Sequence, residues 1–145
     1  MGNITIRGSE LNDLPKLTNL CVELGYPARE DQVLKRLKKL LKSSSETVLV
    51  AVEQTEVIGW IHIFISFRLE SDPFPEIGGL VVSSKYRSIG IGKLLVNAAE
   101  KWALEKGFTK IRVRSRLERT EAKRFYEREG YQVKKSQNVF EKSLK

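Results

Sequence analysis

Apolar residues recur along the chain with two different spacings. Where they return at every third or fourth position they predict amphipathic helices, and where they alternate with polar residues they predict strands. Strands are expected over 4–7, 47–53, 57–65, 76–82 and 109–115, and helices over 13–24, 30–42, 90–106 and 120–129. The segments 131–133 and 138–141 predict a closing hairpin.

This order of elements, β-α-α-β-β-β-α-β-α-β-β, predicts an α/β fold with a mixed β-sheet and helices on both faces. Several strands follow one another through short turns, so only some neighbouring strands can be parallel. The paired glycines Gly78 and Gly79 predict a β-bulge in the strand 76–82. A length of 145 residues suits a single domain, 1–145.

The composition narrows the range of partners. A formal net charge of +8 favours anionic partners, such as nucleic acid, a phospholipid surface or a phosphate-rich small molecule. A single cysteine, Cys21, excludes an intramolecular disulfide, and a single histidine, His62, leaves too few ligands for a Cys/His zinc site, so no metal is expected. His62 is expected to be a structural residue of its strand. Without a signal-like or membrane-spanning apolar run, the expected location is cytoplasmic.

A glycine-containing turn joins the strand 76–82 to the helix 90–106. Unpaired N–H groups at a helix N-terminus attract anions, and Gly90 and Gly92 would let a phosphate approach the backbone closely. The P-loop pattern fails because Arg87 stands where its first glycine belongs, and the dinucleotide pattern fails because Leu95 replaces its third glycine. On these glycines alone, an anion site and a plain turn remain equally open.

Two longer motifs favour the anion site. The segment RSIGIG, 87–92, resembles the Arg/Gln-x-x-Gly-x-Gly/Ala signature of the GNAT-superfamily N-acetyltransferases. The segment AKRFYEREGY, 122–131, resembles the second signature of that family, and the two occur in the family's order and at its usual separation. The order of elements also matches the GNAT fold along essentially the whole chain. The resemblance therefore implies one GNAT acyl-CoA N-acyltransferase domain over 1–145.

The resemblance implies a transferase that moves an acetyl group from acetyl-CoA directly to a primary amine of a small molecule or peptide. The CoA pyrophosphate would lie on the backbone at the start of the long helix, and the pantetheine chain would pair with the strand before it. Where many members have asparagine this chain has Arg119, so the role of that position is not carried over. The residues implied at the cofactor are Leu80, Val81, Val82, Arg87, Ser88, Ile89, Gly90, Ile91, Gly92, Lys93 and Arg119.

Two side chains are implied as catalytic. Tyr126 matches the tyrosine of the second signature, where a phenol can protonate the leaving thiolate. Glu76 begins the cofactor strand, where some members keep a glutamate base that deprotonates the amine. A backbone N–H near Val82 would stabilise the oxyanion. The alternatives remain that Tyr126 is a core aromatic residue and that Glu76 is a solvated strand end.

Two other functions stay open. The basic segment KRLKKLLK, 35–42, is compatible with a nucleic-acid or ribosome-binding module, although it lacks interleaved aromatic residues and nucleic acid is not the expected partner. A GNAT protein could also bind acetyl-CoA without turnover. The acceptor side would be lined by the two N-terminal helices and the loop Arg68–Pro75. The acceptor amine and the choice between a monomer and a homodimer are not specified.

Overall fold

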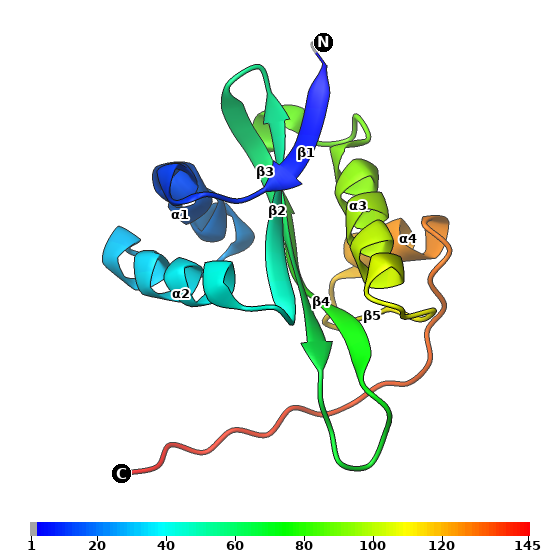
Figure 1. Ribbon diagram of the computed structural model, residues 1–145. Coiled ribbons are helices and arrows are strands. Elements are labelled where there is room, and N and C mark those ends of the chain that lie inside the picture. The colour runs from blue at the N-terminus through cyan, green and yellow to red at the C-terminus, as the bar shows by residue number, and fades with distance from the viewer. Residues whose placement is uncertain (1–2) are drawn as a thin grey trace. The chain divides into compact units, whose positions relative to one another are not determined.

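The computed structural model describes residues 3–145 (Figure 1), and the chain divides into two compact units after Val113. In the first unit the strands are β1 (Ile4–Gly8), β2 (Glu46–Glu53), β3 (Glu56–Ser66), β4 (Phe74–Val82) and β5 (Arg112–Val113). Its helices are α1 (Leu14–Leu24), α2 (Glu30–Lys42) and α3 (Ile91–Glu105). The second unit, Arg114–Lys145, contains α4 (Thr120–Arg128).

The five strands form one mixed sheet in the order β1-β2-β3-β4-β5. Each neighbouring pair from β1 to β4 is antiparallel, and β4 and β5 are parallel. Helices α1 and α2 cover one face of this sheet and α3 covers the other (Figure 1). The predicted α/β fold with a mixed sheet and helices on both faces is therefore confirmed.

Each sheet face has its own apolar core. On the face covered by α1 and α2, here called the α1/α2 face, the helices bury Leu17, Leu20 and Leu37 against Val48, Val50 and Val81, with Trp60 packed beside them. On the opposite face α3 buries Leu95, Val96 and Ala99. Leu94, also on α3, has an exposed side chain and does not belong to this core.

The predicted bulge is present in β4. Facing β3, His62 pairs with Gly79 while the next residue, Ile63, pairs with Ile77, so Gly78 is the extra residue. A Cβ atom at Gly78 would lie 2.8 Å from His62 Nδ1 and 3.1 Å from a ring carbon of Phe64. Glycine is required here because the two aromatic rings occupy the space that any side chain would need.

The bulge also accounts for the shortness of β5. The sequence predicts a strand over 109–115, but only Arg112 and Val113 pair with β4, opposite Glu76 and Ile77. A bulge bends its strand and increases the local twist, so the ladder to a straight neighbour ends where the bulge begins. Beyond Ile77, the edge of β4 that faces away from β3 is not paired with β5.

The closing hairpin predicted over 131–133 and 138–141 is wrong. The structure has no strand between Tyr131 and Lys145, and the side chains of Val133, Val139 and Phe140 are exposed. The apolar residues of this segment are few and lie among lysines, so they do not build an apolar face that could hold two strands together. Instead, α4 ends at a left-handed Gly130, after which the Tyr131 N–H donates to the Tyr126 carbonyl at 2.9 Å.

Helix α1 is anchored by a partly buried ion pair. The residue before the helix is Asp13. Its carboxylate accepts two hydrogen bonds from the Arg7 guanidinium, both 2.9 Å, and one from the Glu10 N–H at 2.8 Å. These bonds join β1 to the start of α1. Within residues 3–145, none of the helices has the length and apolarity needed to cross a bilayer.

The bulge predicts an asymmetric response to alanine. We expect Gly78→Ala to lower the free energy of unfolding by about 1–3 kcal/mol, because the new methyl group overpacks against His62 and Phe64. Gly8→Ala is the matched control, since nothing lies within 4 Å of a Cβ at Gly8. Urea denaturation measures both; a Gly78→Ala protein as stable as the Gly8→Ala protein would contradict the packing argument.

The pair between Arg7 and Asp13 predicts a pH-dependent stability. The Arg7 hydrogen bonds hold the pKa of Asp13 below its usual value. The stabilisation is therefore complete above the unfolded-state pKa of about 4 and is lost as the pH falls through the lower folded-state pKa. We expect Asp13→Asn to cost about 1–2 kcal/mol at pH 7, a figure reduced for the partial exposure of Arg7.

The control for this prediction is Asp31→Asn, which removes the carboxylate of the exposed pair between Arg29 and Asp31. Denaturation midpoints of both variants at pH 7 and pH 3 test the idea. The deficit of Asp13→Asn should narrow at pH 3, whereas the midpoint of Asp31→Asn should follow the wild type at both values. A deficit of Asp13→Asn that stays constant between the two pH values would show that the carboxylate charge is irrelevant.

Candidate functional site

The turn before α3 leaves backbone amides without a capping side chain. Gly90 is the N-cap residue of α3, with φ of 93°, and no side chain caps the first turn. The first helical bond runs from the Leu94 N–H to the Gly90 carbonyl, so the N–H groups of Ile91, Gly92 and Lys93 precede the helical ladder. No atom lies within 4 Å of a Cβ at Gly90. This open, left-handed glycine leaves the positive end of the helix dipole accessible to an anion.

The residues just before Gly90 are held by other contacts. The Arg87 Nε donates to the Val82 carbonyl at 3.2 Å, and an Arg87 terminal nitrogen lies 3.9 Å from a Glu23 oxygen of α1. The same Glu23 carboxylate accepts a bond from the Ser84 N–H at 2.9 Å. Ser88 adopts a left-handed conformation with φ of 66°. The Arg87 side chain thus helps to fix the turn.

The strand that leads into this turn has an open edge. The Ser83 N–H donates to the Ile58 carbonyl of β3 at 2.8 Å. Because successive amides of a strand point to opposite edges, the Val82 N–H points away from β3, to the side where pairing with β5 has already ended. Leu80 and Val82 therefore offer main-chain hydrogen-bonding groups along an edge that leads to the start of α3.

Glu76 lies on β4 just before the bulge. It pairs with Phe64 of β3 and Arg112 of β5, and its side chain is buried. Residues that face each other across a ladder share a sheet face, so Glu76 lies on the α1/α2 face with Phe64 and, two residues along β3, His62. The alternative that Glu76 is a solvated strand end is wrong. The Arg112 guanidinium lies 4.2 Å from the centre of the Phe74 ring on the same strand as Glu76.

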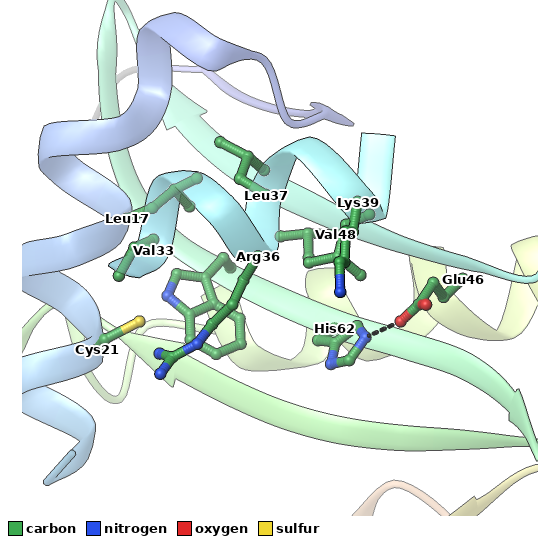
Figure 2. A pocket seen from close by; sticks show the side chains of 11 residues that line it. Leu17, Cys21, Val33, Arg36, Leu37, Lys39, Glu46, Val48 and His62 are labelled. Carbon is green, nitrogen blue, oxygen red and sulfur yellow. Dashed lines mark hydrogen bonds and ion pairs between the residues drawn. The ribbon is translucent and has the colours of Figure 1, made fainter. Parts of the chain in front are cut away.

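A cavity of about 390 Å³ opens between α1, α2 and this same sheet face. Figure 2 shows Arg36 and Lys39 extending from α2, Cys21 lying on α1, and His62 and Glu46 rising from the sheet. A volume of this size is typical of small-molecule sites. The complete lining is Leu17, Cys21, Val33, Arg36, Leu37, Lys39, Leu40, Glu46, Val48, Trp60 and His62.

Two groups in the cavity carry potential chemistry. His62 Nε2 lies 2.9 Å from a Glu46 oxygen, and both side chains are partly exposed (Figure 2). His62 has the hydrogen-bond partner expected of a structural histidine, namely Glu46, but its ring also lines the cavity. Burial raises the pKa of the Cys21 thiol, an effect that the nearby Arg36 charge partly offsets. The thiol is therefore protonated at neutral pH and is a poor nucleophile.

In the second unit, α4 brings Tyr126 and Arg119 together. Burial raises the pKa of Tyr126 to about 12, and the Arg119 charge acts in the opposite direction. The Tyr126 ring packs edge-on against Phe125 and Tyr131, with ring centres 5.0 and 5.6 Å apart. Arg119 is the N-cap residue of α4 and accepts the first helical bond from the Lys123 N–H. The phenol therefore keeps its proton throughout the physiological pH range.

The sequence indicated the turn, Glu76 and a role for the two N-terminal helices on the acceptor side, but not the sheet residues that complete the cavity. Trp60, His62 and Glu46 share a sheet face because of the strand register, and Arg36 joins them from a helix more than twenty residues away along the chain from Trp60. The alternation of Trp60, His62 and Phe64 was a visible signal, but the pairing that completes the floor was not. Among residues 3–145, no three His, Cys, Asp or Glu side chains are arranged to hold a metal ion.

Comparison with known proteins places this geometry in a family. The model of the acetyltransferase (GNAT) family matches residues 12–131. The aminoalkylphosphonate N-acetyltransferase of Salmonella typhimurium is 35% identical over 96 residues, which cover 66% of this chain and 61% of that relative. The chain thus matches about three fifths of that protein's length.

Two solved structures extend the comparison. An aminoglycoside acetyltransferase from an uncultured soil metagenomic sample, in complex with sisomicin, is 26% identical with a TM-score of 0.80, covering 98% of this chain and 97% of that one. An aminoglycoside N-acetyltransferase in complex with CoA has a TM-score of 0.87 at 20% identity, covering 99% and 97% of the two chains, and shows the shared fold. Together with the sheet, the bulged β4 and the turn before α3, the family match leads to one conclusion: the chain belongs to the GNAT acetyltransferase family.

Proposed function

We propose that this protein transfers an acetyl group from acetyl-CoA directly to a primary amine of a small molecule. The observation that carries the proposal is the open edge of β4 leading into the uncapped, left-handed start of α3. The names of similar proteins support the choice of a small-molecule acceptor, since they specify aminoalkylphosphonates or aminoglycosides. The apolar and charged cavity on the α1/α2 face, beside Glu76, is the proposed acceptor site.

The chain's backbone fits the cofactor at two places. The amides of residues 91–93 have no side-chain cap, and the space above Gly90 is empty, so a pyrophosphate could approach them without displacing any group. The main chain of Leu80, Val81 and Val82 would pair with the amide-bearing pantetheine chain as a further strand would. When bound, acetyl-CoA supplies an activated thioester carbonyl, and the cosubstrate is fixed by backbone groups that a side-chain substitution does not remove.

We further propose that both compact units belong to one GNAT domain, 1–145. The family model runs from residue 12 to residue 131 and so crosses the boundary after Val113. It includes Glu76 and Gly90 in the first unit, and Arg119 and Tyr126 in the second. Both proposed catalytic residues therefore fall within one family match.

Glu76 is the proposed base. An alkyl amine is protonated at neutral pH, since its pKa lies near 10, and only the neutral form has the electron pair that attacks a carbonyl carbon. The Glu76 carboxylate, on the sheet face that carries the cavity, accepts the proton from the ammonium group, and the Val82 N–H on the open edge of β4 stabilises the oxyanion.

Tyr126 is the proposed hydrogen-bond donor to the leaving sulfur. With a pKa of about 12, the phenol is protonated whenever the amine reacts. Full proton transfer from this phenol to a thiolate, whose conjugate thiol has an ordinary pKa near 8.5, is unfavourable. The two pKa values differ by roughly 3–4 units, or about 5 kcal/mol. Tyr126 therefore acts as a hydrogen-bond donor to the developing thiolate and keeps its own proton. CoA leaves as the thiolate, which takes a proton from water. Arg119, which lowers the pKa of Tyr126, would make the phenol a stronger donor.

Cofactor binding at the start of α3 is testable with a matched pair of glycines. CoA should raise the melting temperature of the wild type by binding the folded state. Gly90 and Gly107 lie near opposite ends of α3, have φ of 93° and 92°, and have nothing within 4 Å of a Cβ. Alanine should therefore impose a similar strain at both positions, about 1–2 kcal/mol.

We expect Gly90→Ala to weaken CoA binding at least tenfold, because its methyl group enters the space proposed for phosphate. Gly107→Ala should keep the CoA-dependent rise in melting temperature. Thermal denaturation with and without millimolar CoA gives both values. The phosphate site would be excluded if the wild type shows no shift, or if the two variants lose the shift equally.

The proposed acid and base should fail in different ways. Tyr126→Phe keeps the ring and its packing, so CoA binding should persist while turnover falls roughly 10- to 1000-fold at every pH below about 10. Glu76→Gln should be slowest at neutral pH and recover partly as the pH rises, because solution then supplies neutral amine. Release of CoA thiol, followed from pH 6 to 10, measures both profiles.

Each assignment has its own contrary result. Wild-type turnover by Tyr126→Phe would leave Tyr126 as a packing residue only. A pH–rate profile of Glu76→Gln that parallels the wild type would assign the amine's proton to another group, while a loss of CoA binding in that variant would indicate a structural defect instead of a catalytic one.

A further inference from the structure

The cations of α2 divide into two sets. Five basic residues occur on this helix, and an ordinary solvated face would point all of them away from the sheet. Arg36 and Lys39 instead line the cavity, three residues apart and therefore on the same side of the helix (Figure 2). Among residues 3–145, neither forms an ion pair with a carboxylate.

The sheet side of the cavity adds a buried donor. Trp60 Nε1 is buried and has no hydrogen-bond partner among the described residues. The Trp60 ring packs against the backbone of Gly79. Two ring carbons lie 3.1 Å from the position that a Cβ atom of Gly79 would occupy. A buried N–H without a partner is unfavourable, and a ligand oxygen would satisfy it. The one carboxylate of the lining, Glu46, already holds His62 at 2.9 Å.

The cavity lining thus includes two cations and a tryptophan with an unpartnered buried N–H, and it lacks an uncommitted carboxylate. An acceptor with several positive charges would meet repulsion from Arg36 and Lys39, whereas a ligand with anionic oxygens would match all three donors. Net charge points the same way, at +8 for the whole chain.

The register relates this donor set to the proposed base. Phe64 faces Glu76 across the ladder, and His62 is the next residue of β3 on that face. Two residues along a strand span about 7 Å. His62, on the floor of the cavity, therefore lies about that distance along β3 from the position opposite Glu76. A ligand anchored at Arg36 and Lys39 could therefore direct a second group toward Glu76 over a short chain.

We infer that the acceptor is a short-chain amine that carries an anionic group, namely a carboxylate, phosphonate or phosphate. This inference rests on the proposed function and specifies its substrate class. The anionic group lies between Arg36 and Lys39 with Trp60 Nε1 donating to it, and the amine points to Glu76. Arg36 and Lys39 are specificity determinants that bind the far end of the acceptor and do not touch the reacting atoms.

A panel of amines tests this class. With saturating acetyl-CoA, thiol release is measured for β-alanine, 2-aminoethylphosphonate and O-phosphoethanolamine, which distinguish the three anions, and for neutral ethanolamine and polycationic kanamycin. We expect the best anionic amine to exceed ethanolamine at least tenfold in kcat/KM. The advantage should shrink with added salt, because the charges at the cavity mouth are screened.

Substitutions on α2 supply the matched control. Arg36→Gln and Lys39→Gln should each reduce the ratio of kcat/KM between the best anionic amine and ethanolamine at least tenfold, mainly through KM for the anionic amine. Lys38→Gln removes the same charge from an exposed position outside the cavity lining and should keep the wild-type ratio. The CoA-dependent rise in melting temperature should be unchanged in all three variants.

The outcomes separate this inference from the proposed function. If the kcat/KM for ethanolamine or kanamycin equals that for the best anionic amine, the acetyltransfer proposal stands and the anionic acceptor is excluded. If no amine releases thiol although CoA binds, the proposed reaction on small amines is in error. Calorimetric titration of each of the three anionic amines into the CoA-loaded protein then decides the inference: binding that Arg36→Gln abolishes supports it, and no binding by any of them overturns it.

Discussion

The β-bulge at Gly78 is the constraint on which the architecture of the site depends. One additional residue in β4 reverses the side-chain alternation, so Glu76 and Val81, five positions apart, lie on the same sheet face. The same irregularity ends the pairing with β5 after Ile77 and leaves the edge of β4 open. A regular strand in this place would direct either Glu76 or Val81 away from the α1/α2 face. The cost is a glycine held against the ring of His62, with no room for any side chain.

The sequence predicted those elements whose patterns are local. The periodicity of α2 and the turn signals around β3 gave bounds within a residue or so, and the pair Gly78-Gly79 indicated the bulge. Patterns that depend on distant partners were less informative. The extent of β5 is set by the bend of β4. The alternation around Phe140 suggested a strand, but the Phe140 side chain is exposed and does not pack on an apolar surface of the second unit.

The role of each positive charge was likewise not predictable from the sequence. The total of +8 indicated an anionic partner but could not say where. In the folded chain, Arg7 and Arg87 are committed to holding α1 and the turn before α3, whereas Arg36 and Lys39 line a cavity. Only the three-dimensional arrangement distinguishes cations that stabilise the protein from cations that remain available to a ligand, because both sets consist of basic side chains.

The position of Trp60 also gives the molecule an internal optical reporter. The chain has two tryptophans. Trp60 lines the cavity and its indole nitrogen is buried, whereas Trp102 lies on α3, which covers the opposite sheet face, and the Lys106 ammonium is 5.5 Å from its ring centre. Indole emission responds to the polarity and hydrogen bonding around the ring, so a molecule entering the cavity changes the light from one tryptophan and leaves that of the other as a constant background. Occupancy of the site is therefore readable in the native chain, without any label.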